Sequence, residues 1–171
     1  GTYTVAGDLN LYNSSTGARN QHLYVSNNNA AIFNIQGNLN IYNNSPSATD
    51  QHHMYISNRG TVNVTGTTTI ENTGNFGKDK YVYLGNSGDV NLGGNLSITN
   101  SSTANNALVS LAYGSSSHLT INGNTTVSNA GAGNQKRVYF GDYGDVTFNG
   151  DVTATNNSSA ANSEIFFNYR T

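Results

Sequence analysis

The sequence predicts an all-β fold, a three-sided parallel β-helix (β-solenoid) of six coils with about 29 residues in each coil. Three observations predict it: a repeated motif, short stretches of alternating apolar and polar residues, and a scarcity of helix-forming residues. The length of 171 residues falls within the usual range of one domain. We therefore expect residues 1–171 to form a single repetitive unit.

The repeated motif is a glycine followed at two-residue intervals by Leu, Thr or Val, then an aliphatic residue, then an asparagine. It occurs six times, and the coils are expected to start at Gly7, Gly37, Gly66, Gly94, Gly123 and Gly150. Successive glycines are 30, 29, 28, 29 and 27 residues apart. Spacing this regular indicates structural repeats that stack on one another.

Each period holds three stretches in which apolar and polar residues alternate, the pattern of a strand with one buried face. Three short strands per period and no helix describe a coil that buries its apolar side only by stacking on its neighbours. In the period that starts at Gly94, the second stretch is expected to turn Leu111 and Tyr113 inward and Ala112 outward.

The motif also predicts two columns of residues along the coil axis. The glycine at the start of each coil suits a corner with a positive φ angle. By strand parity the asparagine that ends the motif points inward, where stacked side-chain amides can hydrogen-bond along the axis. We interpret this column as a structural ladder, formed by Asn13, Asn43, Asn72, Asn100, Asn129 and Asn156.

An outward column on the second strand of each coil is rich in aromatic residues and is the candidate binding surface. Three interpretations remain open for it: a stabilising ladder, a lateral contact between filaments, or a strip that holds surface glycans. Its aromatic members, with Ala112 expected at the remaining position, are Tyr24, Tyr55, Tyr83, Tyr139 and Phe166.

The two ends of the chain are predicted to fit one another. Residues 1–6 read as the last strand of a coil begun by a preceding unit, and neither end carries an evident polar cap. Joined end to end, residues 164–171 and 1–7 resemble residues 53–66, and the join places the next Gly7 28 residues after Gly150. The partners expected are copies of the same unit, head to tail, as covalent tandem repeats or as stacked subunits.

The expected junction between two units brings together residues from both ends. Asp151 of one unit would lie beside Asp8 of the next. Like charges so close are unfavourable unless they are protonated or bridged, and we hypothesise weak cation binding there. Glu164 would lie between Arg137 of the coil below and His22 of the next unit above. The residues expected at the junction are Tyr3, Val5, Asp8, Asp151, Glu164 and Phe167.

Composition and residue placement argue against several classes of function. A net charge of −2 with seven Lys and Arg provides no basic field for nucleic acid. The nine acidic residues are dispersed rather than paired for catalysis, and the four histidines do not cluster as metal ligands. We expect no enzyme activity, no cofactor and no metal, and no apolar run is long enough to span a membrane.

The phrases GNLxIxN, at Gly37 and Gly94, and VYFGDYGDVTFNG, at 138–150, are the most characteristic of the chain. In this style of repeat, the whole chain resembles the β-solenoid regions of bacterial surface adhesins, such as filamentous-haemagglutinin-like proteins and autotransporter passenger stalks. The resemblance implies an extracellular or cell-surface location, a fibre or stalk role, and attachment to carbohydrate or another surface. The expected function is that of a structural filament unit, with a carbohydrate-binding module as the alternative.

Overall fold

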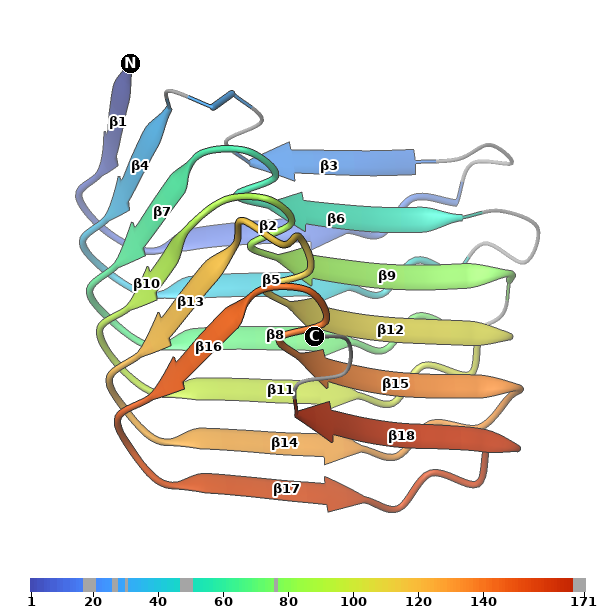
Figure 1. Cartoon of the computed structure of the whole chain (residues 1–171). Helices are drawn as coiled ribbons and strands as arrows, with labels where there is room; N and C mark the ends of the chain where they lie inside the picture. The colour runs from blue at the N-terminus through green and yellow to red at the C-terminus, as the bar shows by residue number, and fades with distance from the viewer. Residues whose placement is uncertain (17–20, 26–27, 30, 47–50, 76, 168–171) are drawn as a thin grey trace.

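A computed structural model describes residues 1–16, 21–25, 28–29, 31–46, 51–75 and 77–167. Within these ranges there are eighteen strands and no helix, and the strands form three parallel sheets of six strands each (Figure 1). None of the described residues belongs to a helix that is long and apolar enough to cross a membrane. The predicted all-β, three-sided solenoid is therefore confirmed.

Consecutive strands lie in different sheets, and each strand pairs in parallel with the strand one coil further on. The first sheet contains β2 (Leu9–Asn13), β5 (Leu39–Asn43), β8 (Thr68–Asn72), β11 (Leu96–Asn100), β14 (Thr125–Asn129) and β17 (Val152–Asn156). The second contains β3 (Gln21–Val25), β6 (His52–Ile56), β9 (Asp79–Leu84), β12 (Asn106–Leu111), β15 (Gln135–Phe140) and β18 (Asn162–Phe167). The third contains β1 (Thr2–Val5), β4 (Ile32–Ile35), β7 (Thr61–Val64), β10 (Val90–Leu92), β13 (His118–Ile121) and β16 (Asp145–Phe148).

Counting from Gly7, the described chain makes five coils that each contain all three strands. The sixth strand of each sheet is supplied by the ends: β1 lies before the first coil, and β17 with β18 follows the fifth. The expected number of six coils thus corresponds to six strands per sheet and to about five complete turns. Residues 168–171, which the sequence join passes through, lie outside the described residues.

The core is a set of apolar columns that run along the solenoid axis. Alternation along each strand turns every second side chain inward, and parallel pairing places like residues in register from coil to coil, as with Ile41, Ile70 and Ile98. Residues of the middle coils, such as Met54 and Ile70, are fully buried. Burial of aliphatic and β-branched side chains in these columns holds the coils together.

The glycines that start the coils do not adopt the predicted positive φ angles. The positive-φ residues include Ser57, Gly85, Ala112 and Gly141, which follow the strands of the second sheet directly. The coil-start glycines serve close packing instead, because a Cβ on Gly37 would lie 2.6 Å from the carbonyl carbon of Gly7. The prediction of positive φ angles at these glycines was therefore wrong, and close approach of neighbouring backbones explains the glycine column instead.

A second correction concerns the coil that starts at Gly94. The pairing aligns Val109 with Val138 and Leu111 with Phe140, so Val109 and Leu111 occupy the inward positions. Ala112 is the left-handed residue of the corner, and Ser110 takes the outward position that had been expected for Ala112. The other described residues at this corner are Ser57, Gly85 and Gly141, and the alanine hid the end of the strand.

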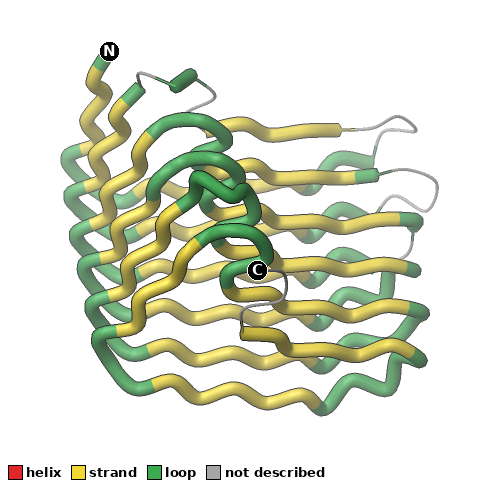
Figure 2. The backbone as a smooth tube through the Cα atoms, viewed as in Figure 1, coloured by secondary structure: helices red, strands yellow, loops and turns green. Residues whose placement is uncertain are grey.

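The core columns are open at both ends of the solenoid. Strands β1, β2 and β3 form one end and β16, β17 and β18 the other, and each is an edge strand of its sheet (Figure 2). Tyr3 is 60% exposed at the first end, and Phe167 is 49% exposed at the second. All five residues of β17 are exposed, whereas β11 buries three of its five.

Candidate functional site

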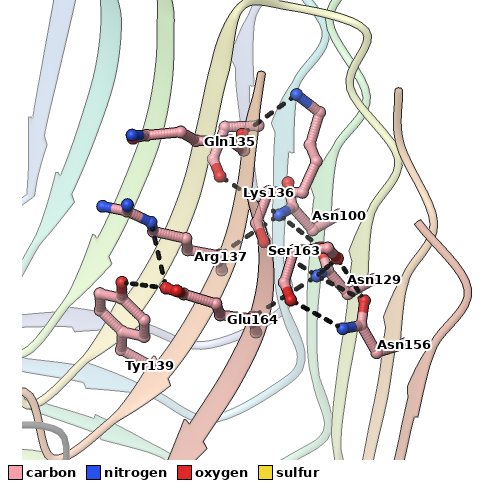
Figure 3. A network of polar contacts seen from close by, with 10 residues as sticks. Asn100, Asn129, Gln135, Lys136, Arg137, Tyr139, Asn156, Ser163 and Glu164 are labelled. Carbon is pink, nitrogen blue, oxygen red and sulfur yellow. Dashed lines mark hydrogen bonds and ion pairs between the residues drawn. The ribbon is translucent and has the colours of Figure 1, made fainter. Parts of the chain in front are cut away.

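The six asparagines that end the strands of the first sheet form one column at the corner with the second sheet. Asn72 Nδ2 donates to Asn100 Oδ1 at 2.9 Å, and Asn100 Nδ2 donates to Asn129 Oδ1 at 3.0 Å. Asn129 continues the chain of amides to Asn156 at 3.0 Å, as Figure 3 shows. Asn43 donates to Asn72 in the same direction at 3.0 Å.

From Asn43 to Asn156, these amides also join the first sheet to the second. Asn72 Nδ2 donates to the carbonyl oxygen of Lys80 at 2.9 Å, and Asn129 Nδ2 donates to that of Lys136 at 3.1 Å. The polar column therefore satisfies backbone groups where the chain leaves the sheets for a loop. Such buried amides are stabilising only when they are hydrogen-bonded, so their role is structural.

One rung of this column is not made. Asn13 and Asn43 are neighbours in the pairing of β2 with β5. The Nδ2 of Asn13 and the Oδ1 of Asn43 are both buried, yet neither has a hydrogen-bond partner among the described residues. The unmade rung lies at the open end formed by β1, β2 and β3.

Three tyrosines of the outward strip form a continuous stack. The ring centroids of Tyr24 and Tyr55 are 4.9 Å apart with an interplanar angle of 7°, and those of Tyr55 and Tyr83 are 5.1 Å apart at 8°. Rings stacked in this way turn their faces toward one another along the axis and their edges toward solvent. Tyr24, at the end of the stack, is 50% exposed.

The rest of the predicted strip is not a continuation of that stack. Ser110 interrupts it and is fully buried, and Tyr113 instead packs edge-to-face on Tyr83 at 5.2 Å. Tyr139 is only 3% exposed, and its hydroxyl donates to Glu164 Oε2 at 2.9 Å (Figure 3). Phe166 packs edge-to-face on Tyr139 at 5.7 Å and is 38% exposed.

A second aromatic column lies beside the stack, where His53 stacks on Tyr81 at 4.7 Å. Burial, reinforced by the neighbouring His22, lowers the pKa of His53 to about 4. Burial raises the pKa of Tyr81 to about 12 and that of Tyr83 still further. These groups are uncharged at neutral pH, which suits a packed aromatic layer on the outside of the second sheet.

Two fully buried lysines were missed by the sequence reasoning, although they occupy the inward parity of the second sheet two residues before Val82 and Val138. Lys136 Nζ donates to the carbonyl oxygens of Ala104 at 2.6 Å and Gln135 at 3.1 Å (Figure 3). Burial lowers the pKa of Lys136 to about 8. Parity, taken without regard to charge, would have found both Lys80 and Lys136.

The residues expected at a unit junction are divided between the two open ends. Tyr3, Val5 and Asp8 lie at the end formed by β1, β2 and β3. Asp151, Glu164 and Phe167 lie at the opposite end. Within one chain, the structure does not bring the two groups together.

At the second end, part of this group already has partners. Glu164 forms an ion pair with Arg137 Nε at 3.3 Å, and Phe167 stacks on Phe140 with centroids 5.0 Å apart. Both side chains thus continue columns from the preceding coils to the end formed by β16, β17 and β18.

No protein-family model matches this chain, and no curated protein or solved structure matches it.

Proposed function

We propose that the chain is a structural repeat unit of an extracellular filament or adhesin stalk, which stacks head to tail on copies of itself into a long β-solenoid. The observation that carries this proposal is the pair of open ends. At both ends, apolar columns and the edge strands of three sheets meet solvent. Exposed strand edges are templates for pairing with another chain, and a heterologous end-to-end contact produces a fibre.

The energetics favour such a contact. Burial of apolar surface contributes roughly 25 cal/mol per Å². A stacked coil would cover Tyr3 at one end and Val152 and Phe167 at the other, which are 60%, 39% and 49% exposed. It would also pair the free backbone groups of the three edge strands, as every internal pair of coils does.

The extracellular and bacterial parts of the proposal rest on the resemblance in repeat style. A low content of charged residues, 9%, and an Asn-, Ser-, Thr- and Gly-rich surface agree with a passive rod. The rod provides length and stiffness, with lateral contacts between rods or surface glycans as further partners.

The alternative function, a carbohydrate-binding module, has less support from the aromatic strip. Sugar rings stack on aromatic faces, but Tyr24, Tyr55 and Tyr83 present their edges to solvent. Replacement of the central ring, Tyr55→Ala, distinguishes the roles. We expect a less stable chain, by about 2 kcal/mol, because two stacked pairs are lost. Loss of retention on immobilised polysaccharide without loss of stability would favour the alternative.

The proposed function is tested by light scattering and electron microscopy of the chain over a range of concentrations. We expect concentration-dependent rods whose width is constant and whose length grows. The variant Val152→Lys places a charge in an apolar column at the open end and should abolish growth. Its control, Thr153→Lys, changes the adjacent outward residue of β17 and should leave growth intact. A chain that stays monomeric at all concentrations contradicts self-assembly.

A further inference from the structure

Gly7 differs from the other glycines that start the coils. A Cβ on Gly66 would lie 2.7 Å from the carbonyl oxygen of Gly37, and on Gly94 it would lie 2.6 Å from that of Gly66. A Cβ on Gly150 would lie 2.5 Å from the carbonyl oxygen of Gly123. A Cβ on Gly7 would meet no atom of the described residues within 4 Å.

In every case the missing Cβ points at the coil before. The later glycines are therefore required by the carbonyl groups of a preceding coil, whereas Gly7 has no such requirement within the chain. At Gly7, which lies between β1 and β2, glycine costs conformational entropy on folding without a packing gain in the described part of the chain. Gly7 thus leaves room for the backbone of a preceding coil, at an end of the solenoid where the described chain has no preceding coil.

A second observation at the same end points the same way. In the asparagine column, the side-chain nitrogen donates toward the following coil from Asn43 to Asn129. Asn13 should continue this order, but its Nδ2 and the Oδ1 of Asn43 have no hydrogen-bond partner in the described part of the chain. A hydrogen-bond donor from a preceding coil, directed at Asn13 Oδ1, would favour the amide orientation in which Asn13 Nδ2 donates to Asn43 Oδ1.

A third observation concerns the residue that follows each glycine. Asp8 Oδ1 accepts from the backbone N–H of Asn38 at 2.7 Å, and Asn124 Oδ1 accepts from that of Asp151 at 3.0 Å. Asn95 and Asn124 repeat the contact at 2.9 Å. Asp151 has the same position before β17, and its exposed carboxylate has no following coil in the described part of the chain to donate to it.

We infer that the end formed by β1, β2 and β3 is a docking surface for the β16–β18 end of a second copy of this chain, in one register. That register places Gly7 against Gly150, Asp8 against Asp151 and Asn13 against Asn156. The inference rests on the proposed function and adds to it the residues that fix the alignment.

In this register, each contact that is unmade at the two ends is made by the residue of the other copy that occupies the equivalent position in the repeat. The carboxylate of Asp151 accepts the backbone N–H of Asp8, and the amide of Asn156 donates to Asn13. The ring of Phe166 packs on the half-exposed ring of Tyr24, and Glu164 lies beside His22. The two carboxylates lie in adjacent coils, and each has a backbone N–H to offset their repulsion.

The variant Gly7→Val tests this register. Its Cβ would meet no described atom within 4 Å in the single chain, so the thermal unfolding temperature of the monomer should be unchanged. In the docked pair it would collide with the backbone at Gly150, so association should fall about tenfold or more, which corresponds to 1.4 kcal/mol. The control is Asn10→Val, on the exposed outward face of β2, which should associate normally.

A tandem of two copies, joined directly from residue 171 to residue 1, gives a second measurement that does not require association between chains. Gly7→Val in the second copy lies at the internal junction and should lower the unfolding temperature of the tandem by about 2 °C or more. The same change in the first copy lies at the free end and should not. Equal effects of the two changes would overturn the register.

These results separate this inference from the proposed function. If the unaltered chain forms rods and Gly7→Val forms them equally well, the register is wrong and stacking remains. If the unaltered chain stays monomeric and the tandem is no more stable than the single chain, both are wrong.

Discussion

At the scale of single residues, the solenoid depends on side chains that are polar, buried and hydrogen-bonded. Asn100 illustrates why asparagine occupies the corner column. Its amide accepts from Asn72 and donates to Asn129, and it also lies 3.3 Å from the carbonyl oxygen of Arg137. Each coil needs a side chain at this corner that both donates and accepts hydrogen bonds. That side chain must also be of the right length to reach the backbone of the second sheet.

The variant Asn100→Ala should lower the free energy of unfolding by about 3 kcal/mol, because it leaves an N–H of Asn72 and the Oδ1 of Asn129 without a partner. Urea unfolding measures the change. The matched control is Asn91→Ala, which removes an exposed amide that donates to Asn63 at 2.8 Å and should change stability by no more than about 0.5 kcal/mol. Equal losses in the two variants would contradict a buried ladder.

Buried ionisable residues predict a maximum of stability in mildly alkaline solution. The pKa of Lys136 is about 8 in the folded chain and 10.5 in the free side chain. Between these pH values the unfolded chain binds more protons, so the free energy of unfolding rises with pH. Above about pH 10 it falls, because the raised pKa of Tyr81 and Tyr83 means that the unfolded chain loses protons that the folded chain keeps.

Urea unfolding at pH 7.5, 9, 10 and 11, values chosen to bracket the cited pKa shifts, measures this profile. In Lys136→Met the rise between pH 8 and 10 should be smaller, while the fall at higher pH remains. A rise of undiminished size in that variant would mean that another group causes it.

At the scale of elements, the sequence predicted strands and their faces well, because alternation and a fixed period reflect burial directly. The asparagines were predicted to point inward for the same reason. Conformation at corners was harder to predict. Close approach of two backbones and a positive φ angle both favour glycine, so the identity of Gly37 alone does not separate them.

In the fourth coil, the corner conformation was missed because the corner residue is not a glycine. Its corner residue, Ala112, has a φ of 55° and lacks the glycine that ends the equivalent strands at Gly85 and Gly141. The strand therefore seemed to continue by two residues. The buried lysines were missed because charge outweighed parity in the assignment of faces. Contacts between the two end faces would form between two copies of the chain, so the structure of one chain does not contain them.

The left-handed corner yields a prediction of its own. Ala112→Gly should raise the free energy of unfolding by about 0.5 kcal/mol, because relief of left-handed strain exceeds the entropy cost of glycine. The converse change, Gly141→Ala, should lower it by about 1 kcal/mol. Urea midpoints at an unchanged m-value measure both. Changes of the same sign in the two variants would contradict a shared corner conformation.

At the scale of the whole molecule, stability should vary along the axis. A strand in the middle of a sheet has two neighbours, whereas β1, β2, β3, β16, β17 and β18 each have one. The exposed residues of β17 contrast with the fully buried Ile70 of β8. The open ends should therefore fray before the middle coils unfold.

Hydrogen exchange measures this gradient. In dilute solution, amides of β8 and β11 should exchange most slowly and those of β1 and β17 most rapidly. At concentrations where rods form, exchange at β17 should slow while exchange at β8 stays the same. Uniform protection along a dilute chain would contradict the gradient.

The one-way order of hydrogen bonds in the asparagine column has a consequence for any larger assembly. From Asn43 to Asn129, each amide nitrogen donates toward the C-terminal end of the rod, so the two ends of the column are chemically different. A rod built from this unit would have a fixed polarity, with every copy facing the same way and growth at its two tips proceeding at unequal rates. Anchored at one tip, it would always present the same face at the other.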